Sequence, residues 1–318
     1  MRRRRALWLP LLATLPRAVC AQGASRAWRV GALGPVVNVM LRNALRDIGY
    51  VEGQNLVFEG RIFDDLDRLP LLARELAKAR LDVVVPIGLA ATRAVLADGT
   101  DVPVVFFANF DPVAVGLVGN LARPGGRLTG ILIAPDGTLA GKRVELLKAA
   151  VPHAKRIALL LPEDPTVALS IQAQDTRQAA TAQGLSLFDV VVQRGRYEAA
   201  FAAIAAARND GLVVGAHTFF MRDRSTIIEL ATRHRLPAIY EWREQVAEGG
   251  LMAYSTSLTG QYARVANYID RILKGARAGD LPIERPARFG LVVNLKAARA
   301  IGLTLPQALL LRADEVIE

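Results

Sequence analysis

The sequence contains one cysteine and three histidines, and this shortage excludes several kinds of site. Cys20 has no second cysteine to pair with, so the chain cannot form an internal disulfide. The histidines are His153, His217 and His234, and no two of them have the spacing of metal ligands. We therefore expect no metal site.

Motifs that bind phosphates or activate a serine are also missing. Neither G-x-x-x-x-G-K-S/T nor G-x-G-x-x-G occurs, and the run Gly31-Ala32-Leu33-Gly34 has the wrong glycine spacing. No serine stands in G-x-S-x-G, the motif of the α/β-hydrolase nucleophile. Because these signatures are absent, we expect no cofactor, no catalytic residues and no enzymatic activity.

Positive charge is unevenly spread along the chain. The 40 lysines and arginines give a net charge of +10 against 30 acidic residues. Five of these cations, Arg2 to Arg5 and Arg17, fall in the first twenty residues, and the rest are interspersed with acidic side chains. A DNA-binding regulator with this kind of fold would carry a helix-turn-helix at its N-terminus. In this chain the N-terminus is taken up by the short basic segment. We therefore expect no nucleic-acid partner.

The first 21 residues have the pattern of an export signal. A basic start is followed by apolar residues 6–15 and by Val19-Cys20-Ala21, a small-residue cleavage site. The apolar part is too short to span a bilayer, which needs about 20 residues, and no later run is longer. We expect cleavage near Ala21 and a periplasmic mature protein without thiol chemistry. The arginine run also permits a twin-arginine route, and a basic disordered tail is the alternative interpretation.

From residue 28 onwards, strand-like and helix-like patterns alternate, which is typical of parallel sheets covered by helices. The first half predicts strands at 28–33, 55–59, 82–86, 102–107 and 127–133, and helices at 36–48, 66–78 and 88–96.

The alternation starts again after residue 135 and predicts a second α/β lobe. This half predicts strands at 156–161, 187–192, 211–214, 237–240, 251–254 and 289–294, and helices at 139–150, 166–183, 196–208, 226–234, 258–274 and 295–301. The fold class that follows is α/β, with two Rossmann-like lobes, parallel sheets and more than one crossing between them. Such lobes form a hinge and a central cleft.

Candidate site residues are those that follow predicted strands, because ligands of open α/β sheets gather at strand carboxyl ends. The run 102–107 ends in Asn109, Asp111 and Pro112, and Pro112 suits the first turn of a following helix that Asp111 caps. The complete set of candidate ligand-binding residues is Gly34, Pro35, Gly88, Leu89, Asn109, Asp111, Glu163, His217, Tyr240 and Glu241.

Each of these residues also has a structural interpretation that the sequence leaves open. Asp111 could serve as a cap alone, Gly88 could serve a tight turn, and His217 could be a loop residue. If they line a pocket, Asp111 would pair with an amino group, backbone amides near Gly88 would hold an anionic end, and Tyr240 would clamp the apolar body of the ligand.

Six segments resemble the ABC transporter substrate-binding protein family that includes tryptophan-binding members. They are GYVEGQNLVFEGR at 49–61, DPVAVGLVGNLARPGGRLTGI at 111–131, GKRVELLKAAVP at 141–152, RHRLPAIY at 233–240, EGGLMAY at 248–254 and LLLRADEVIE at 309–318. The resemblance implies the type I periplasmic-binding-protein fold. We accordingly expect an N-terminal lobe of residues 22–134 plus 255–280 and a C-terminal lobe of residues 135–254 plus 281–318.

The resemblance implies an exported receptor that captures a small organic ligand, amino-acid-like or aromatic, and delivers it to an ABC permease in the inner membrane. A periplasmic sensor for a signalling partner is the alternative, and a two-lobed transferase is a third. This chain departs from its relatives at Leu89, where a small hydroxyl residue is usual, at Ala216-His217, and in a shorter run before residue 49. Tryptophan is therefore not expected as the ligand.

Overall fold

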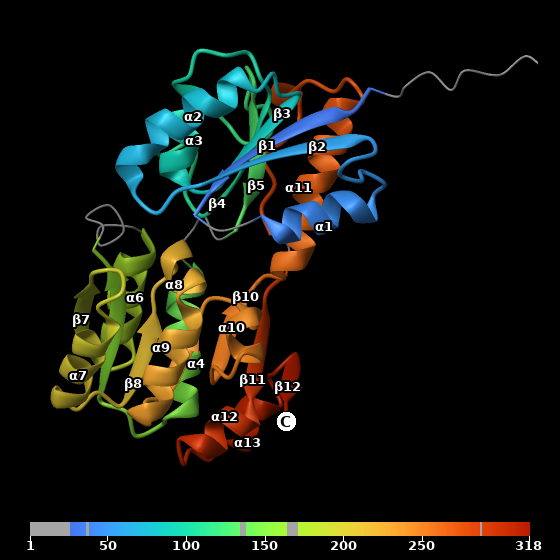
Figure 1. Ribbon diagram of the computed structural model, residues 1–318. Helices are drawn as coiled ribbons and strands as arrows, with labels where there is room; N and C mark the ends of the chain where they lie inside the picture. Colours follow the sequence, from blue (N-terminus) through green and yellow to red (C-terminus); the bar gives the residue numbers. More distant parts are fainter. Residues whose placement is uncertain (1–25, 36–37, 134–137, 164–170, 287) are drawn as a thin grey trace, which may run out of the picture.

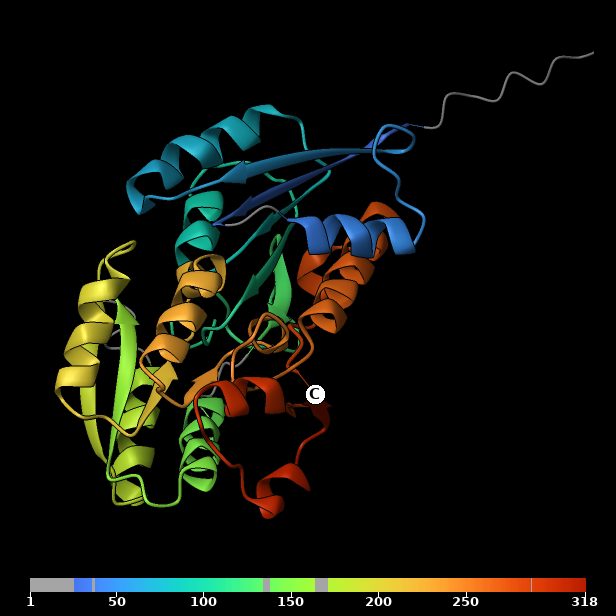
Figure 2. The same cartoon turned by 60° about the horizontal axis from the view of Figure 1, so that its bottom comes forward.

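The computed structural model describes residues 26–35, 38–133, 138–163, 171–286 and 288–318. The expected export signal lies outside this part of the chain, as does the start of the helix expected at 166–183. The described residues form two α/β lobes, drawn one above the other in Figure 1 and from a second side in Figure 2.

The first lobe has a five-stranded parallel sheet in the order β2-β1-β3-β4-β5. Its strands are β1 (Trp28–Gly34), β2 (Leu56–Ile62), β3 (Val83–Pro86), β4 (Val104–Ala108) and β5 (Leu128–Leu132). Its helices are α1 (Val39–Asp47), the 3-10 turn η1 (Leu66–Arg68), α2 (Leu69–Lys78), α3 (Leu89–Leu96), α11 (Leu258–Leu273) and the 3-10 turn η2 (Ala278–Asp280).

Helices cover both faces of this sheet, which explains its continuous apolar strands. In β3, Val83 and Val85 join a core with α1 and α11, while Val84 joins the opposite core with α2 and α3. Successive strand side chains point to opposite faces, so a strand buried on both sides must be apolar throughout. In α11, Ser257 caps the first turn by accepting a hydrogen bond from the amide of Gly260 at 3.1 Å.

The second lobe has a seven-stranded sheet in the order β12-β11-β10-β9-β8-β6-β7. Its strands are β6 (Arg156–Pro162), β7 (Ser186–Val192), β8 (Gly211–Val214), β9 (Ala238–Tyr240), β10 (Met252–Ser255), β11 (Gly290–Asn294) and β12 (Glu315–Ile317). Its helices are α4 (Thr138–Ala150), α6 (Ile171–Ala182), α7 (Tyr197–Ala206), α8 (Thr218–Arg222), α9 (Arg224–Arg233), α10 (Arg243–Ala247), α12 (Leu295–Ala300) and α13 (Gln307–Leu310).

The chain passes between the lobes three times. It crosses from β5 to α4, returns from β10 to α11, and crosses again before β11. The last crossing starts beside β5, where the backbone amide of Leu132 donates to the carbonyl of Glu284 at 2.8 Å. Residues 281–284 therefore pack with the first lobe, and the return to the second lobe comes later than the predicted boundary at 281.

Three expectations about the fold were wrong in detail. Residues 112–116 form turns instead of the expected helix, and Gly116 has a φ of 74° that an α-helix does not accommodate. The short elements α8, α10, α13 and β12 were not anticipated. The second sheet is not wholly parallel, because β11 runs antiparallel to β10. The path of the chain explains this: β10 ends at the junction between the lobes, whereas β11 enters the lobe there.

Candidate functional site

The carboxyl ends of the parallel strands in both lobes point toward the junction between the lobes (Figure 1). β1 ends at Gly34 and is followed by Pro35, Gly88 lies just beyond β3, and Asn109 follows β4. From the second lobe, Glu163 follows β6, His217 lies three residues beyond β8, and Glu241 follows β9. The topology thus places most sequence-predicted residues at one junction, and their individual surroundings differ.

Asn109 and Glu241 are the pair of predicted residues that the fold brings together from the two lobes. Glu241 is only 6% exposed, and this burial raises the pKa of its carboxyl. The charge of Arg143 and the polar side chains of Asn109 and Trp242 oppose that rise. A buried carboxyl beside a buried guanidinium is therefore located where lobe meets lobe.

Arg143, in the second turn of α4, was not predicted from sequence. It is 2% exposed, and its Nε donates to the Tyr254 carbonyl at the end of β10, at 3.0 Å. Its Nη2 is buried and has no hydrogen-bond partner. Burial lowers the pKa of Arg143, and the nearby charge of Glu241 opposes this effect. Within the described part of the chain, no acidic oxygen is paired with Arg143 at 4.0 Å or less, so Glu241 and Arg143 interact as charges without forming an ion pair.

Trp242, the residue after Glu241, belongs to the apolar core. It is 5% exposed and belongs to the same apolar cluster as Leu258 and Tyr262 of α11, in the first lobe. Leu139 of α4 joins this cluster from the other crossing. The apolar core of the first lobe therefore continues across the junction, next to the Arg143 and Glu241 charges.

Two further buried amides with an orphaned oxygen lie in the first lobe near the crossings. Asn38 precedes α1 and is 5% exposed, and its Oδ1 has no hydrogen-bond partner. Gln261 of α11 donates from Nε2 to Thr256 Oγ1 at 2.8 Å, while its Oε1 has no partner. Sequence reasoning missed both, since nothing in their spacing separates them from ordinary helix residues.

Gly88 has a backbone conformation that explains why glycine stands there. Its φ of 88° and ψ of 165° are open almost only to glycine. Its amide donates to the carbonyl of Phe107 at 3.0 Å, and its own carbonyl accepts the hydroxyl of Thr92 at 2.7 Å. The Gly88 amide is thus already satisfied by β4, while Leu89 begins α3 half-buried.

Asp111 caps a turn, as one of its two interpretations predicted. Its Oδ1 accepts hydrogen bonds from the amides of Val113 at 2.9 Å and Ala114 at 3.1 Å. The side chain is half-buried, and its capping role uses one of the two carboxylate oxygens. Pairing with a ligand amino group through Asp111 stays a prediction.

His217 caps the short helix α8 by accepting a hydrogen bond from the amide of Phe219 on Nδ1, at 3.2 Å. Its ring stands edge-on to the Phe219 ring, with centroids 4.7 Å apart, and the Arg194 guanidinium lies over the Phe219 ring at 5.4 Å from its centroid. The histidine is therefore part of an aromatic and cationic cluster at the end of β8.

The remaining predicted residues lie in different surroundings, and a ligand contact through any of them stays a prediction. Tyr240 is 1% exposed within the core of the second lobe, where it packs on α10 and β10 neighbours. Glu163 is exposed and accepts a hydrogen bond from Gln193 at 3.1 Å. Gly34 and Pro35 are buried, and a Cβ added to Gly34 would lie 2.9 Å from the Ile87 side chain.

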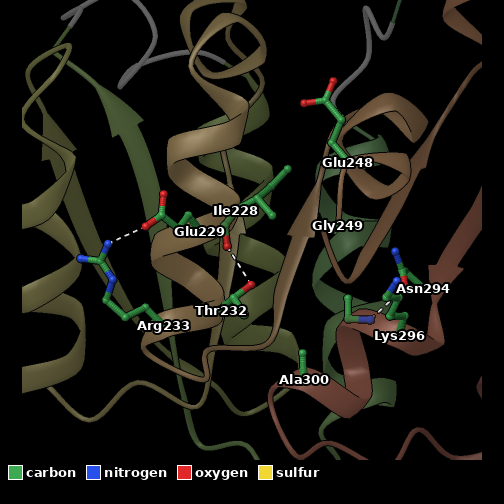
Figure 3. Close-up of a pocket in the computed structure, with 10 residues that line it drawn as sticks. Ile228, Glu229, Thr232, Arg233, Glu248, Gly249, Asn294, Lys296 and Ala300 are labelled. Carbon is green, nitrogen blue, oxygen red and sulfur yellow. Dashed lines mark hydrogen bonds and ion pairs between the residues drawn. The ribbon is translucent and has the colours of Figure 1, made fainter.

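A separate groove lies on the second lobe, between α9 and α12 (Figure 3). Thr232 and Arg233 line it from the carboxyl end of α9, and Asn294 from the end of β11. Both ends point away from the junction, since α9 runs against the parallel strands and β11 starts at the junction. Arg233 is engaged by Glu229 at 2.7 Å and by Glu198 at 3.0 Å.

Two features are absent from the described residues. They contain no group of three or more histidine, cysteine, aspartate or glutamate side chains arranged to hold a metal ion. None of their helices combines the length and the apolar character that crossing a membrane requires.

Comparison with known proteins identifies the family. The family model described as ABC transporter substrate binding protein matches residues 38–317. A tyrosine-binding protein of Clostridioides difficile (strain R20291) is 22% identical over 259 residues, which cover 81% of this chain and 74% of that protein.

Solved structures agree on the fold, which is that of type I periplasmic binding proteins. A conserved domain protein from Vibrio cholerae superposes with a TM-score of 0.80 at 24% identity, covering 92% of this chain and all of that one. An ABC domain from Streptococcus pneumoniae in complex with L-Trp superposes with a TM-score of 0.79 at 23% identity and the same coverage. Because the family model spans most of its length, the chain belongs to the ABC transporter substrate-binding protein family.

Proposed function

We propose that the protein is the exported receptor of an ABC importer, which captures a small organic molecule between its lobes in the periplasm and presents it to a permease in the inner membrane. The observation that carries this proposal is the set of buried polar groups at the lobe junction, above all Arg143 Nη2 with no partner. Membership of the family supports the same function.

The ligand is expected to be amino-acid-like. One relative is named a tyrosine-binding protein, and one similar structure was solved in complex with L-Trp. Aromatic amino acids are therefore the first compounds to test. Ligand contacts from both lobes would favour a closed arrangement over an open one, so binding shifts an equilibrium without any chemical step. The proximity of Asn109 from the first lobe and Glu241 from the second supports such shared contacts.

A thermal-shift panel of amino acids and aromatic acids tests this function. A ligand present at a hundredfold excess over its Kd stabilises the folded state by about 2.7 kcal/mol, which shifts the melting temperature measurably. Small-angle scattering on the same samples should show a smaller radius of gyration with ligand than without. If no small molecule from the panel or from a cell extract stabilises the protein, the receptor function is wrong.

A further inference from the structure

The guanidinium of Arg143 presents a donor that the folded chain does not use. Its Nε is engaged by the Tyr254 carbonyl at 3.0 Å, whereas Nη2 is buried and has no acceptor. A buried donor without a partner is costly, and more so when it is charged. Such a group is retained where a partner that comes and goes can satisfy it.

The nearest acidic group does not serve as that partner. Glu241 affects Arg143 electrostatically, but no carboxylate oxygen of Glu241 comes within 4.0 Å of an Arg143 nitrogen. The Glu241 carboxyl is approached instead by Asn109 and Trp242. The Arg143 charge therefore stays available to an external acceptor at the junction.

The first lobe offers a weaker anion site than the sequence suggested. Of the backbone amides near Gly88, which were expected to hold an anionic end, the amide of Gly88 itself is bonded to the Phe107 carbonyl. The first residue of α3 is Leu89, which has no hydroxyl to donate. The strongest unused donor that the described residues place at the junction is thus in the second lobe.

We propose that Arg143 binds the carboxylate of a small monocarboxylic ligand through Nη2, and that this contact selects acids over their neutral analogues. The inference rests on the proposed receptor function. It adds to that function the charge of the ligand and the residue that binds the charged group. An Arg–carboxylate hydrogen bond is short and strong because both groups are charged. The Glu241 carboxyl acts electrostatically on Arg143, so further negative charge near this contact would be disfavoured.

The test uses a deproteinised cell extract as the probe. The purified protein is incubated with the extract, washed, denatured, and the released small molecule is identified by mass spectrometry. The same capture is repeated with Arg143→Gln, which keeps a similar volume without the charge, and with Arg196→Gln, which removes an exposed arginine of the second lobe. We expect a captured monocarboxylic acid for the wild type and for Arg196→Gln, and at least a tenfold loss of capture for Arg143→Gln.

Matched pairs of compounds give the second measurement. The captured acid and its amide are compared by calorimetric titration, and L-tyrosine with L-tyrosinamide by thermal shift. The acid should bind the wild type at least tenfold more tightly than the amide, and Arg143→Gln should abolish the difference. The double variant Arg143→Gln/Glu241→Gln, which leaves no buried charge unpaired, replaces the single variant if that one does not fold.

The outcomes separate this inference from the receptor function. A captured ligand without a carboxylate, or an acid that Arg143→Gln binds as tightly as the wild type does, overturns the role of Arg143 and leaves the receptor function standing. Failure to capture any molecule overturns both.

Discussion

Arg143 and Glu241 show how two buried charges can be tolerated without direct contact. Taking either from water costs several kcal/mol, and the attraction between them offsets only part of this. The pKa values of the two residues agree with this balance. Burial lowers the pKa of Arg143 and raises that of Glu241, and the charge of each residue opposes the pKa shift of the other. Each buried charge is therefore stabilised by the presence of the other.

A double-mutant cycle at these two residues measures that dependence. Arg143→Gln leaves the Glu241 carboxyl buried without its cation, and we expect a loss of about 3 kcal/mol in the free energy of unfolding at pH 7. Glu241→Gln should cost a similar amount. The double variant should cost less than the sum by about 1–3 kcal/mol, as determined from urea unfolding. Strict additivity would mean that the two charges do not interact.

The pH dependence of these variants has a definite sign. Because the folded-state pKa of Glu241 is raised, the folded protein binds more protons than the unfolded chain as pH rises above the unfolded value of about 4.3. The Glu241 contribution therefore lowers stability as pH rises from that value toward the folded pKa. In the Arg143→Gln background, further replacement of Glu241 by Gln should flatten this decline in melts recorded between pH 4 and 7.

Gly88 provides a test of backbone conformation at the end of β3. Its φ of 88° is strained for any residue with a Cβ, although a Cβ would find open space. Gly88→Ala should thus destabilise the protein by about 1–3 kcal/mol through the backbone alone. Gly119→Ala is the matched control, since Gly119 also has open space around its Cβ and is not among the positive-φ residues. Equal effects of the two substitutions would contradict the backbone argument.

Among the elements, those with a clear period could be predicted from the sequence and the short ones could not. The apolar stripe of α11 and the valines of β3 define their elements locally. In contrast, α10 has only five residues, too few for a period, and the direction of β11 depends on where the chain re-enters the second lobe. Such features follow from the whole path of the chain.

The site was predictable to the same extent. Asn109 and Glu241 were predicted because they follow strands, and topology alone brings strand carboxyl ends together. Arg143 stands in a helix, within the run GKRVELLKAAVP, where only its complete burial distinguishes it from the half-buried Lys142 and Lys148. A site residue that comes from the middle of a helix can be identified only when the packing of that helix is known.

The contact between α1 and α11 has a pH dependence of its own. The hydroxyl of Tyr50, just after α1, donates to Asp270 of α11 at 2.8 Å, and burial together with this carboxylate raises the pKa of Tyr50 to about 12. The folded state then keeps a proton that the unfolded chain loses above its ordinary pKa of about 10. Stability contributed by this phenol is therefore lost as pH rises from 10 to 12.

Replacing Tyr50 with Phe tests that contribution. The variant should lose about 1 kcal/mol at pH 7, where the hydrogen bond is intact. Between pH 10 and 12, its stability should fall less steeply than that of the wild type in denaturant titrations. Parallel pH profiles for the two proteins would show that the Tyr50 phenol does not titrate in this contact.

At the scale of the whole molecule, the two lobes share one apolar cluster through Trp242. This side chain follows β9 of the second lobe and is buried with Leu258 and Tyr262. The other tryptophan of the described residues, Trp28, starts β1 at the end of the sheet remote from the junction, with Arg26 lying 5.2 Å from its ring. A change in how the lobes meet should thus alter the surroundings of Trp242 and leave those of Trp28 unchanged.

Tryptophan fluorescence can therefore report lobe closure. Saturation with the ligand captured from extract should change the emission of the wild type and of Trp28→Phe by a similar amount. Trp242→Phe keeps an aromatic ring in the cluster but removes the reporter, so its emission should no longer respond although calorimetry still detects binding. A response that persists in Trp242→Phe and disappears in Trp28→Phe would place the ligand-induced change in the first sheet, away from the junction, and would contradict closure between the lobes.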